Sequence, residues 1–193
     1  QTVVVAGKQV TQPTAVATRL RPEGETVGAF VTARALATPT FVVEPGLRFD
    51  ARDATNDREI NPRLNVAWTL GGGILRAAWG LYSQRQGWHE LHVADGETQL
   101  RRAERAEHKI IGYEHALGRG VSLRLEAYER TSWRLRPRWE NVDNGYDLFP
   151  EAQPDRVLIQ PKEGRARGVE VLLASRGNRE LTWNVSYALA RAE

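Results

Sequence analysis

Two histidines and two carboxylates lie close together in a polar stretch of this 193-residue chain. His89 and His92 form a His-x-x-His pair, and Glu90 and Asp95 lie beside them. Imidazole and carboxylate groups are metal ligands, and such a pair could bind a metal ion if it lay on one helical turn. The pair does not have the zinc-protease spacing, and histidines in loops are usually solvated. We therefore expect no metal site and no cofactor.

Other reactive patterns are missing. The chain has no cysteine, which excludes disulfides, thiolate metal sites and cysteine nucleophiles. Nucleophile-elbow, P-loop and dinucleotide-binding motifs are absent, because the glycines 71–73 join two predicted strands and do not begin a helix. The net charge of +3 and pI near 9.5 come from scattered arginines. We expect neither an enzyme nor a nucleic-acid-binding protein.

The elements that position these residues are predicted to be strands. In the stretch from His108 to Arg130, two strands flank a turn at residues 117–120. Apolar side chains alternate with polar ones along the second strand, which is the period of two expected for a strand. The apolar positions are Val121, Leu123, Leu125 and Ala127, and the polar ones are Ser122, Arg124, Glu126 and Tyr128.

The same alternation predicts further strands. They cover residues 40–50, 60–70, 75–82, 108–117, 121–131, 165–175 and 181–191, with a weaker candidate at 26–37. Pro45 lies inside the first of these and cannot donate a hydrogen bond to a neighbouring strand. Residues 100–107 have the composition of a short charged helix. Residues 1–25 are a poorly defined lead-in containing a strand remnant and a loop.

The predicted connections alternate between short and long along the chain. Short turns at 38–39, 71–73, 117–120 and 176–179 alternate with long loops at 51–59, 83–107 and 132–164. This order, with strands of roughly 10 to 12 residues, is typical of outer-membrane β-barrels. We expect an all-β, antiparallel up-and-down meander of about nine strands forming part of a large transmembrane β-barrel, with short periplasmic turns and long extracellular loops.

The two faces of the predicted strands agree with this arrangement. Charged residues Arg48, Arg76, Arg124, Glu126 and Glu170 share the polar face and would point into a barrel lumen. Aromatic side chains lie near strand ends on the apolar face, where membrane interfaces place them. They are Phe41, Trp68 and Trp183 toward the short turns, and Phe49 and Trp133 toward the long loops. A soluble sheet with one solvated face remains an alternative at each single strand.

Several short motifs, taken in order, resemble a known family. They are FVVEPGLRFD at 41–50, INPRL at 60–64, LRAAWG at 75–80, ERAEHKIIGYE at 104–114 and RGVE at 167–170. The ordered set, over residues 27–192, resembles the barrel of TonB-dependent outer-membrane receptors. The resemblance implies energy-coupled uptake of a scarce ligand such as an iron chelate, cobalamin or an oligosaccharide, with no bond chemistry.

The chain also departs from the family pattern. It has no N-terminal plug with a TonB-contacting box and no terminal aromatic strand, and about nine strands compare with about 22 in plugged transporters. It begins at Gln1 and contains no methionine. We therefore expect a processed or excised piece, with residues 26–193 forming a partial transmembrane barrel. The resemblance implies outer-membrane lipid as a partner, the TonB complex through a plug outside this chain, and a small-molecule ligand.

Ligand contacts are expected from the long loops. Aromatic side chains with polar tips and arginine guanidinium groups make specific contacts with polar ligands. The candidates are Trp88, His89, Arg101, Arg102, Trp139, Asn141, Asp143 and Tyr146. A soluble β-sandwich, for example a carbohydrate-binding module that displays Trp139 and Tyr146, is the alternative function.

Overall fold

A nine-stranded antiparallel sheet makes up most of the computed structural model, which describes residues 2–5, 8–11, 23–93, 96–141, 156–175 and 181–193. The strands of this sheet are β3 (Thr26–Thr32), β4 (Ala35–Thr38), β5 (Phe41–Arg52), β6 (Asp57–Leu70), β7 (Gly73–Gln84), β8 (Glu104–Gly118), β9 (Val121–Trp133), β12 (Glu163–Ser175) and β13 (Trp183–Ala192). Two separate hairpins pair β1 (Thr2–Val5) with β2 (Lys8–Thr11) and β10 (Arg138–Asn141) with β11 (Arg156–Ile159).

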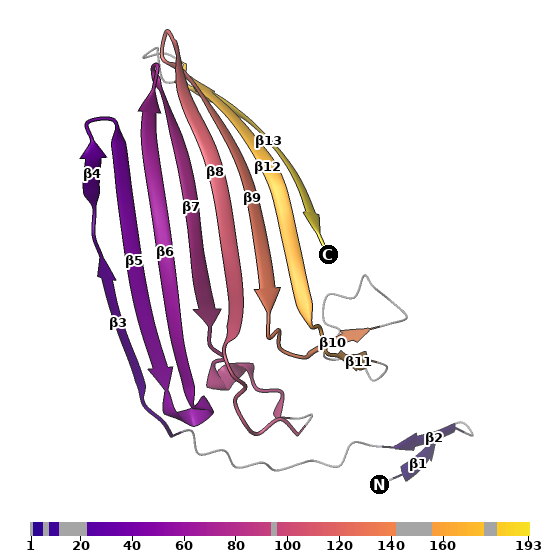
Figure 1. Cartoon of the computed structure of the whole chain (residues 1–193). Coiled ribbons are helices and arrows are strands. Elements are labelled where there is room, and N and C mark those ends of the chain that lie inside the picture. Colours follow the sequence, from indigo (N-terminus) through magenta and orange to yellow (C-terminus); the bar gives the residue numbers. More distant parts are fainter. Residues whose placement is uncertain (1, 6–7, 12–22, 94–95, 142–155, 176–180) are drawn as a thin grey trace.

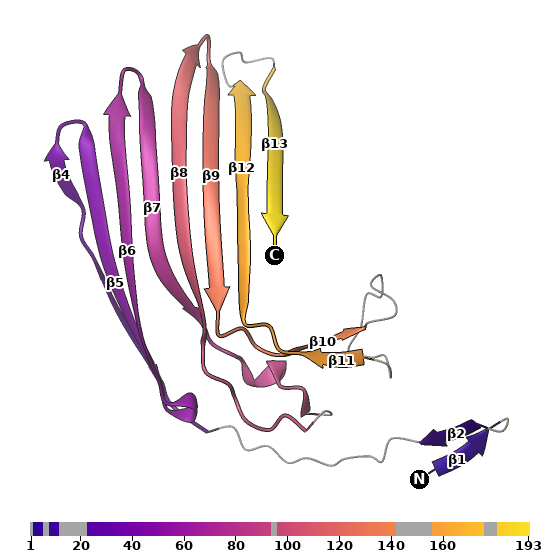
Figure 2. The ribbon, with the colours of Figure 1, turned by 45° about the vertical axis from the view of Figure 1, so that its right-hand side comes forward.

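The strands of the sheet follow one another in sequence order. From one edge the order is β13, β12, β9, β8, β7, β6 and β5, and β3 and β4 then pair in turn with β5. The hairpin of β10 and β11 lies within the connection from β9 to β12 (Figures 1 and 2). This is the predicted up-and-down meander of about nine strands, and the all-β fold class is confirmed.

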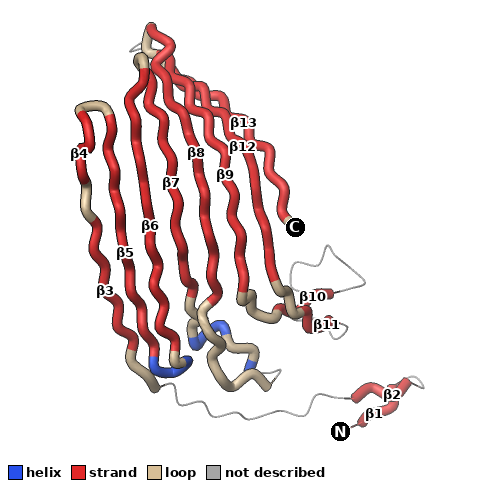
Figure 3. The backbone as a smooth tube through the Cα atoms, in the orientation of Figure 1, coloured by secondary structure: helices blue, strands red, loops and turns tan. Residues whose placement is uncertain are grey.

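The two ends of the sheet differ in their connections, as Figure 3 shows with strands in red and loops in tan. At the turn end, β6 joins β7 through Gly71 and Gly72, and β8 joins β9 through Arg119 and Gly120. All four residues have positive φ angles, between 49° and 91°. Glycine adopts this conformation without strain, which explains its use in tight hairpins. At the loop end lie the 3-10 turn η1 (Asp53–Thr55) and the loop 85–103, which contains η2 (Trp88–Glu90).

Two predictions about the loop end were wrong. The stretch 51–59 is no long loop, because β5 continues to Arg52 and β6 begins at Asp57. The stretch 100–107 is no helix, because β8 begins at Glu104, which pairs with Gln84 of β7. In both places pairing with a neighbouring strand supplies backbone hydrogen bonds, and this outweighs the local composition. Within the described residues, no helix is long and apolar enough to cross a membrane.

The strand register separates the side chains into two faces. On the apolar face, one row across the sheet contains Val43, Val66, Ala77, Ile111, Ala127, Val169 and Leu189. The polar face carries Arg48 of β5, Arg76 of β7, Arg124 and Glu126 of β9, and Glu170 of β12, as predicted. Pro45 is accommodated within β5 opposite Leu64, and its carbonyl accepts a hydrogen bond from the N–H of Ala33. Its missing N–H therefore does not interrupt the strand.

The apolar face has no second layer packed on it in the described part of the chain. On β13, Val185, Tyr187 and Leu189 are each about 60% exposed. Only Leu91, Ala103 and Ala106 are buried apolar residues among those described, and the first two belong to the loop 85–103. A β-sandwich needs two sheets packed face to face. The described strands form one large sheet and two small hairpins, so this structure does not support the sandwich alternative.

Candidate ligand-binding site at the loop end

Three acidic side chains of β5 and β6 are buried on the polar face at the loop end of the sheet, and the loop 85–103 contacts two of them, Asp50 and Asp57. Asp50, Asp57 and Glu59 are 5%, 3% and 2% exposed. Asp57 accepts hydrogen bonds from the Arg102 guanidinium at 3.1 Å and from the Ala103 N–H at 2.9 Å. A buried carboxylate is tolerated only when it is paired and hydrogen-bonded. The loop therefore supplies the partners that allow this acid to be buried.

The other two buried acids connect further segments to the sheet. Glu59 forms ion pairs with Arg105 at 3.1 Å and with Arg134 at 2.8 Å. Asp50 pairs with Arg48 of its own strand at 2.7 Å and with Arg85, the first residue of the loop, at 3.3 Å. Together with the contacts of Asp57, these ion pairs attach both ends of the loop 85–103 and the residues after β9 to the sheet.

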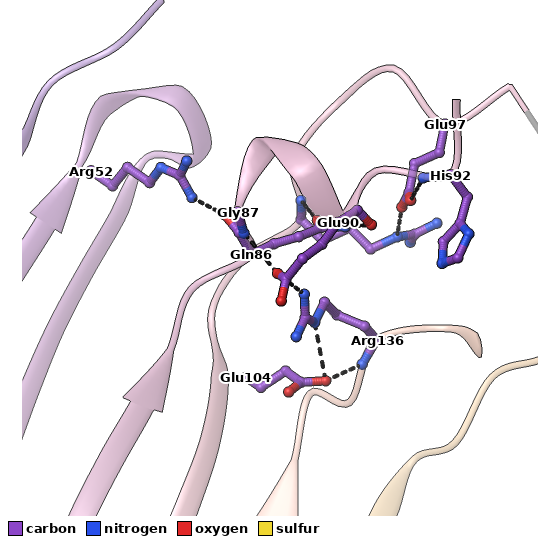
Figure 4. A network of polar contacts seen from close by, with 9 residues as sticks. Arg52, Gln86, Gly87, Glu90, His92, Glu97, Glu104 and Arg136 are labelled. Atoms are coloured by element: carbon purple, nitrogen blue, oxygen red, sulfur yellow. Dashed lines mark hydrogen bonds and ion pairs between the residues drawn. The ribbon is translucent and has the colours of Figure 1, made fainter. Parts of the chain in front are cut away.

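A second group of contacts joins the two long loops (Figure 4). The Arg136 guanidinium donates to Glu90 Oε2 at 2.6 Å and lies 3.4 Å from Glu104 Oε1. The backbone N–H of Arg136 also donates to Glu104 at 2.7 Å. Gln86 holds the loop internally, because its side chain accepts from the Arg101 N–H and donates to the Glu90 carbonyl. Arg136 is thus the residue that ties the loop 85–103 to the segment after β9.

The electrostatics of this group favour charged carboxylates. The Gly87 backbone N–H, followed by the Arg136 guanidinium, holds the pKa of Glu90 below its usual value. Burial alone would raise the pKa of Glu97, but hydrogen bonds from the His92 N–H and Arg101 outweigh it, so this pKa is also lowered. Both carboxylates are ionised at neutral pH.

A hollow of about 290 Å³ lies between the two loops. Its polar lining includes Glu90, His92, Glu97, Arg136 and Arg138, and its apolar lining comes from Leu135 and two prolines. The volume is close to the lower end of the range for small-molecule sites. Donors and acceptors of both charges converge on it, so the arrangement can bind a polar molecule and offers no nucleophile paired with a base.

The predicted ligand contacts on the loop 85–103 lie around this hollow without lining it. The Arg52 guanidinium lies 5.8 Å from the centre of the Trp88 ring, and His89 is exposed beside Gly87. Arg101 is paired with Glu97 at 2.9 Å, and Arg102 is paired with Asp57. Both arginines hold the loop in place, although about half of each side chain stays exposed.

The remaining predicted contacts belong to the second long loop. Trp139 and Asn141 lie on β10, next to Arg138 of the hollow. Asp143 and Tyr146 lie outside the described residues. Among the residues that the structure does describe, no three histidine, aspartate or glutamate side chains come together as a metal site, and Asp95 lies outside them. The roles of all eight residues in ligand binding stay a prediction.

Sequence reasoning did not find Arg136, Glu104 or Gln86. These residues are separated by up to 50 positions and meet only because β7, β8 and β9 are neighbours in the sheet. A weak signal was present in the segment RLRPRW at 134–139, where arginines alternate beside a proline in a loop rich in aromatic residues.

Comparison with solved structures identifies related architectures. The siderophore receptor PirA from Pseudomonas aeruginosa superimposes with a TM-score of 0.63 at 18% identity, over 86% of this chain and 32% of PirA. The sheet shares its fold with part of this receptor. The FrpB iron transporter from Neisseria meningitidis, in the F5-1 apoprotein form and the F3-3 variant, gives a TM-score of 0.62 at 17% identity, over 88% of this chain and 26% of FrpB.

The similarity is one of fold. The chain spans about a third of the length of PirA and about a quarter of FrpB. At this level the resemblance to TonB-dependent receptors suggested by the short motifs is confirmed. The similar proteins are a receptor and a transporter, not enzymes. No protein-family model matches the sequence, and no curated protein matches it either.

Proposed function

We propose that residues 26–193 form part of the transmembrane barrel wall of an outer-membrane TonB-dependent receptor. In this proposal the apolar face meets lipid, the polar face lines the lumen, the turn end is periplasmic and the loop end is extracellular. The observation that carries it is the position of the apolar band on the sheet, which reaches farther toward the loop end on β5 to β7 than on β8 to β13.

On β5 and β6 the apolar band extends far toward the loop end. In register, the pairs run from Phe41 and Trp68 at the turn side to Phe49 and Ile60 at the loop side. β5 has five successive positions on this face that carry Phe, Val, Pro or Leu, from Phe41 to Phe49, and β6 has six that carry Ile, Pro, Leu, Val or Trp, from Ile60 to Leu70. Five alternate positions correspond to nine residues, the length of a tilted transmembrane strand.

On β8 to β13 the apolar band ends nearer the turn end, by three rows compared with β5 and β6 and by two rows compared with β7. Its last apolar row there contains Ile111, Ala127, Val169 and Leu189, and the next row contains Lys109, Glu129, Arg167 and Arg191. At the turn side the band also moves, because Trp183 of β13 lies one row beyond Leu70 of β6 and two rows beyond Phe41 of β5. Both boundaries therefore shift in the same direction.

A flat membrane predicts this shift. Take strands spaced about 4.8 Å apart and tilted by about 40° from the membrane normal. The flat membrane surface then crosses each strand about 4 Å farther along its length than it crosses the strand before, which is ~0.6 of the spacing between successive side chains on one face. Five steps lead from β6 to β13. The expected displacement over these steps is thus about 3 rows. The loop-side boundary lies three rows nearer the turn end at Leu189 of β13 than at Ile60 of β6, and the change occurs between β6 and β8. A soluble sheet has no reason to follow a slanted plane.

The transported ligand follows from the loop end and from the fold. We propose import of a scarce small molecule, of which an iron chelate is favoured over cobalamin or an oligosaccharide because the similar folds belong to a siderophore receptor and an iron transporter. The long loops would bind it through the hollow that Glu90 and Arg136 help to line and through the aromatic residues nearby. Coupling to the TonB complex would use a plug domain outside residues 26–193, and the wall itself performs no bond chemistry.

A charge placed on the apolar face tests the membrane orientation. Val185 is 62% exposed in the middle of the β13 band. In the full-length protein, Val185→Arg should lower the amount in the outer-membrane fraction, since arginine near the bilayer midplane costs about 2 to 4 kcal/mol. The matched control is Ser186→Arg, one position away on the polar face, which should assemble normally. Equal assembly of both variants, or a water-soluble monomeric wild type, would contradict the proposal.

A further inference from the structure

A second pocket, of about 360 Å³, adjoins the hollow between the two long loops. We call it the wall pocket, because its lining comes mainly from β7, β8 and β9. The lining side chains on the polar face include Tyr82, Gln84, His108, Arg130 and Ser132. Glu104 and Leu135 line both spaces. The wall pocket therefore lies next to the hollow, on the side of the sheet.

Arg130 is an exposed arginine whose nearest neighbours on the polar face carry no negative charge. His108 lies opposite it on β8, and Ala166 lies opposite it on β12. The positions diagonal to it, or next on its own strand, are Ala106, Ile110, Gly164, Gly168, Tyr128 and Ser132. Within the described residues Arg130 forms no ion pair, and its Nε donates a hydrogen bond to the Ser132 hydroxyl at 3.1 Å.

The other charged groups in the lining of the wall pocket already have partners. Arg105 pairs with Glu59 at 3.1 Å. Glu104 accepts from the Arg136 backbone N–H at 2.7 Å and lies 3.4 Å from the guanidinium of the same residue (Figure 4). Among the described lining residues, Arg130 is thus the charged group without a counter-charge. A guanidinium binds a carboxylate through two parallel N–H contacts, so the wall pocket has a place for one carboxylate.

Elsewhere on the polar face, arginines pair with acids of the chain itself. The pairs are Arg48 with Asp50 at 2.7 Å, Arg76 with Glu114 at 3.5 Å and Arg124 with Glu126 at 2.7 Å. Arg63, in the row of Arg130, instead has its guanidinium carbon 4.6 Å from the centre of the Tyr82 ring. The Tyr82 and His108 ring centres are 4.5 Å apart. This series of contacts holds the His108 ring beside Arg130.

We propose that the wall pocket binds a carboxylate group of an anionic iron chelate that moves from the loops toward the lumen. The Arg130 guanidinium would hold the carboxylate, and the His108 ring and the Ser132 hydroxyl would border it. Arg63, behind Tyr82, adds a second positive charge to the same row. The inference rests on the proposed function, because it takes the polar face as the lumen wall and an iron chelate as the ligand.

The test is isothermal titration calorimetry of the full-length protein in detergent with two ferric chelates of opposite charge. The wild type should bind ferric citrate, which is anionic, more tightly than ferrioxamine B, which is cationic. Arg130→Gln should weaken the binding of ferric citrate about tenfold, the loss expected for a charge-assisted contact, and should leave ferrioxamine B unaffected. Arg130→Lys should keep part of the affinity, because it retains the charge without the planar fork.

The matched control is Arg76→Gln. Arg76 is another exposed arginine of the polar face, but it has Glu114 as its partner, so its loss should leave ferric citrate binding unchanged. Equal binding of ferric citrate by Arg130→Gln and the wild type would overturn the proposal, as would a wild type that binds ferrioxamine B as tightly as ferric citrate.

A carboxylate of the plug domain is the competing occupant of the wall pocket. In that case Arg130→Gln would lower the thermal stability of the ligand-free protein and leave ferric citrate binding unchanged, and the proposal would be wrong. The outer-membrane fraction of the wild type, measured beforehand, shows separately whether the proposed function holds.

Discussion

The turn end and the loop end of this sheet are held by different kinds of contact. At the turn end, Tyr113 packs over Gly73 and stacks on His115, with ring centroids 5.9 Å apart. At the loop end, three buried acids and their arginines fix the connections. Close packing depends little on pH or salt, whereas paired charges depend on protonation. Side-chain packing thus stabilises the turn end of the sheet, whereas ion pairs stabilise the loop end, which is the proposed ligand-binding part.

The largest expected effect comes from removing a buried acid. Glu59→Gln leaves Arg105 and Arg134 without their shared carboxylate, and a broken buried ion pair costs about 3 to 5 kcal/mol when both partners are fully buried. Arg134 is 36% exposed, so we expect about 2 to 3 kcal/mol. Limited trypsin digestion should cut faster at Arg105 and Arg134, which lose their shared partner.

Glu44→Gln provides the control for that experiment. Glu44 of β5 lies on the same polar face of the sheet as Glu59. It forms no ion pair within the described residues and is far from the loops. Its replacement should leave the digestion rate unchanged. If Glu59→Gln digests like the wild type, the buried acid does not hold the loop end and the contrast between the two ends fails.

A side chain added at Gly73 tests the packing of the turn end. A Cβ there would overlap the present position of the Tyr113 hydroxyl, so the ring would have to move. Gly73→Val should lower the free energy of unfolding by about 1 to 3 kcal/mol, as overpacking does. The midpoint of unfolding in denaturant measures this change.

A double-variant cycle sharpens the same point. If the Tyr113 ring is the obstacle, Gly73→Val should cost much less in a Tyr113→Ala background, and the two effects should not add. Additive effects would show that Tyr113 and Gly73 act independently.

The smallest expected effect is on pH dependence. Because the pKa of Glu90 is lowered in the folded loop, the folded state binds fewer protons than the unfolded state near acid pH. Its stabilising contribution is complete above the ordinary value of 4.5 and is lost as the pH falls through the lowered folded pKa. Hydrogen exchange of the loop 85–103 should therefore accelerate below about pH 4.5.

Glu90→Gln should reduce this acid response, because the variant has no proton to gain at that position. The difference in loop exchange between the wild type and Glu90→Gln, measured at each pH, isolates the contribution of this carboxylate. A wild-type loop whose protection is constant down to pH 3 would contradict the role given to Glu90.

Most of the sheet could be predicted from the sequence. The alternation in 121–131 and the glycines at 71–73 placed strands and turns correctly, because both signals depend only on neighbouring residues. The missed elements lie where local composition disagrees with pairing. Residues 104–107 have helix-forming composition and still extend β8, and Asp57 begins β6 inside a stretch of charged and amide residues.

The candidate site was less accessible to sequence reasoning. Trp88, His89, Arg101 and Arg102 were placed in the correct loop, but the contact between Glu90 and Arg136 joins residues 46 positions apart. Residue type indicated which side chains could bind a polar ligand. It could not show that Arg102 faces Asp57 and holds the loop, because that contact depends on where the loop packs.

The sequence by itself determined the two faces of each strand and the position of most turns. Successive strand side chains point to opposite sides, and this local rule needs no knowledge of neighbours. The tertiary structure alone decided the register between strands. The register sets where the apolar band ends on each strand and which ion pairs hold the loop end, since each requires residues far apart in the chain to meet.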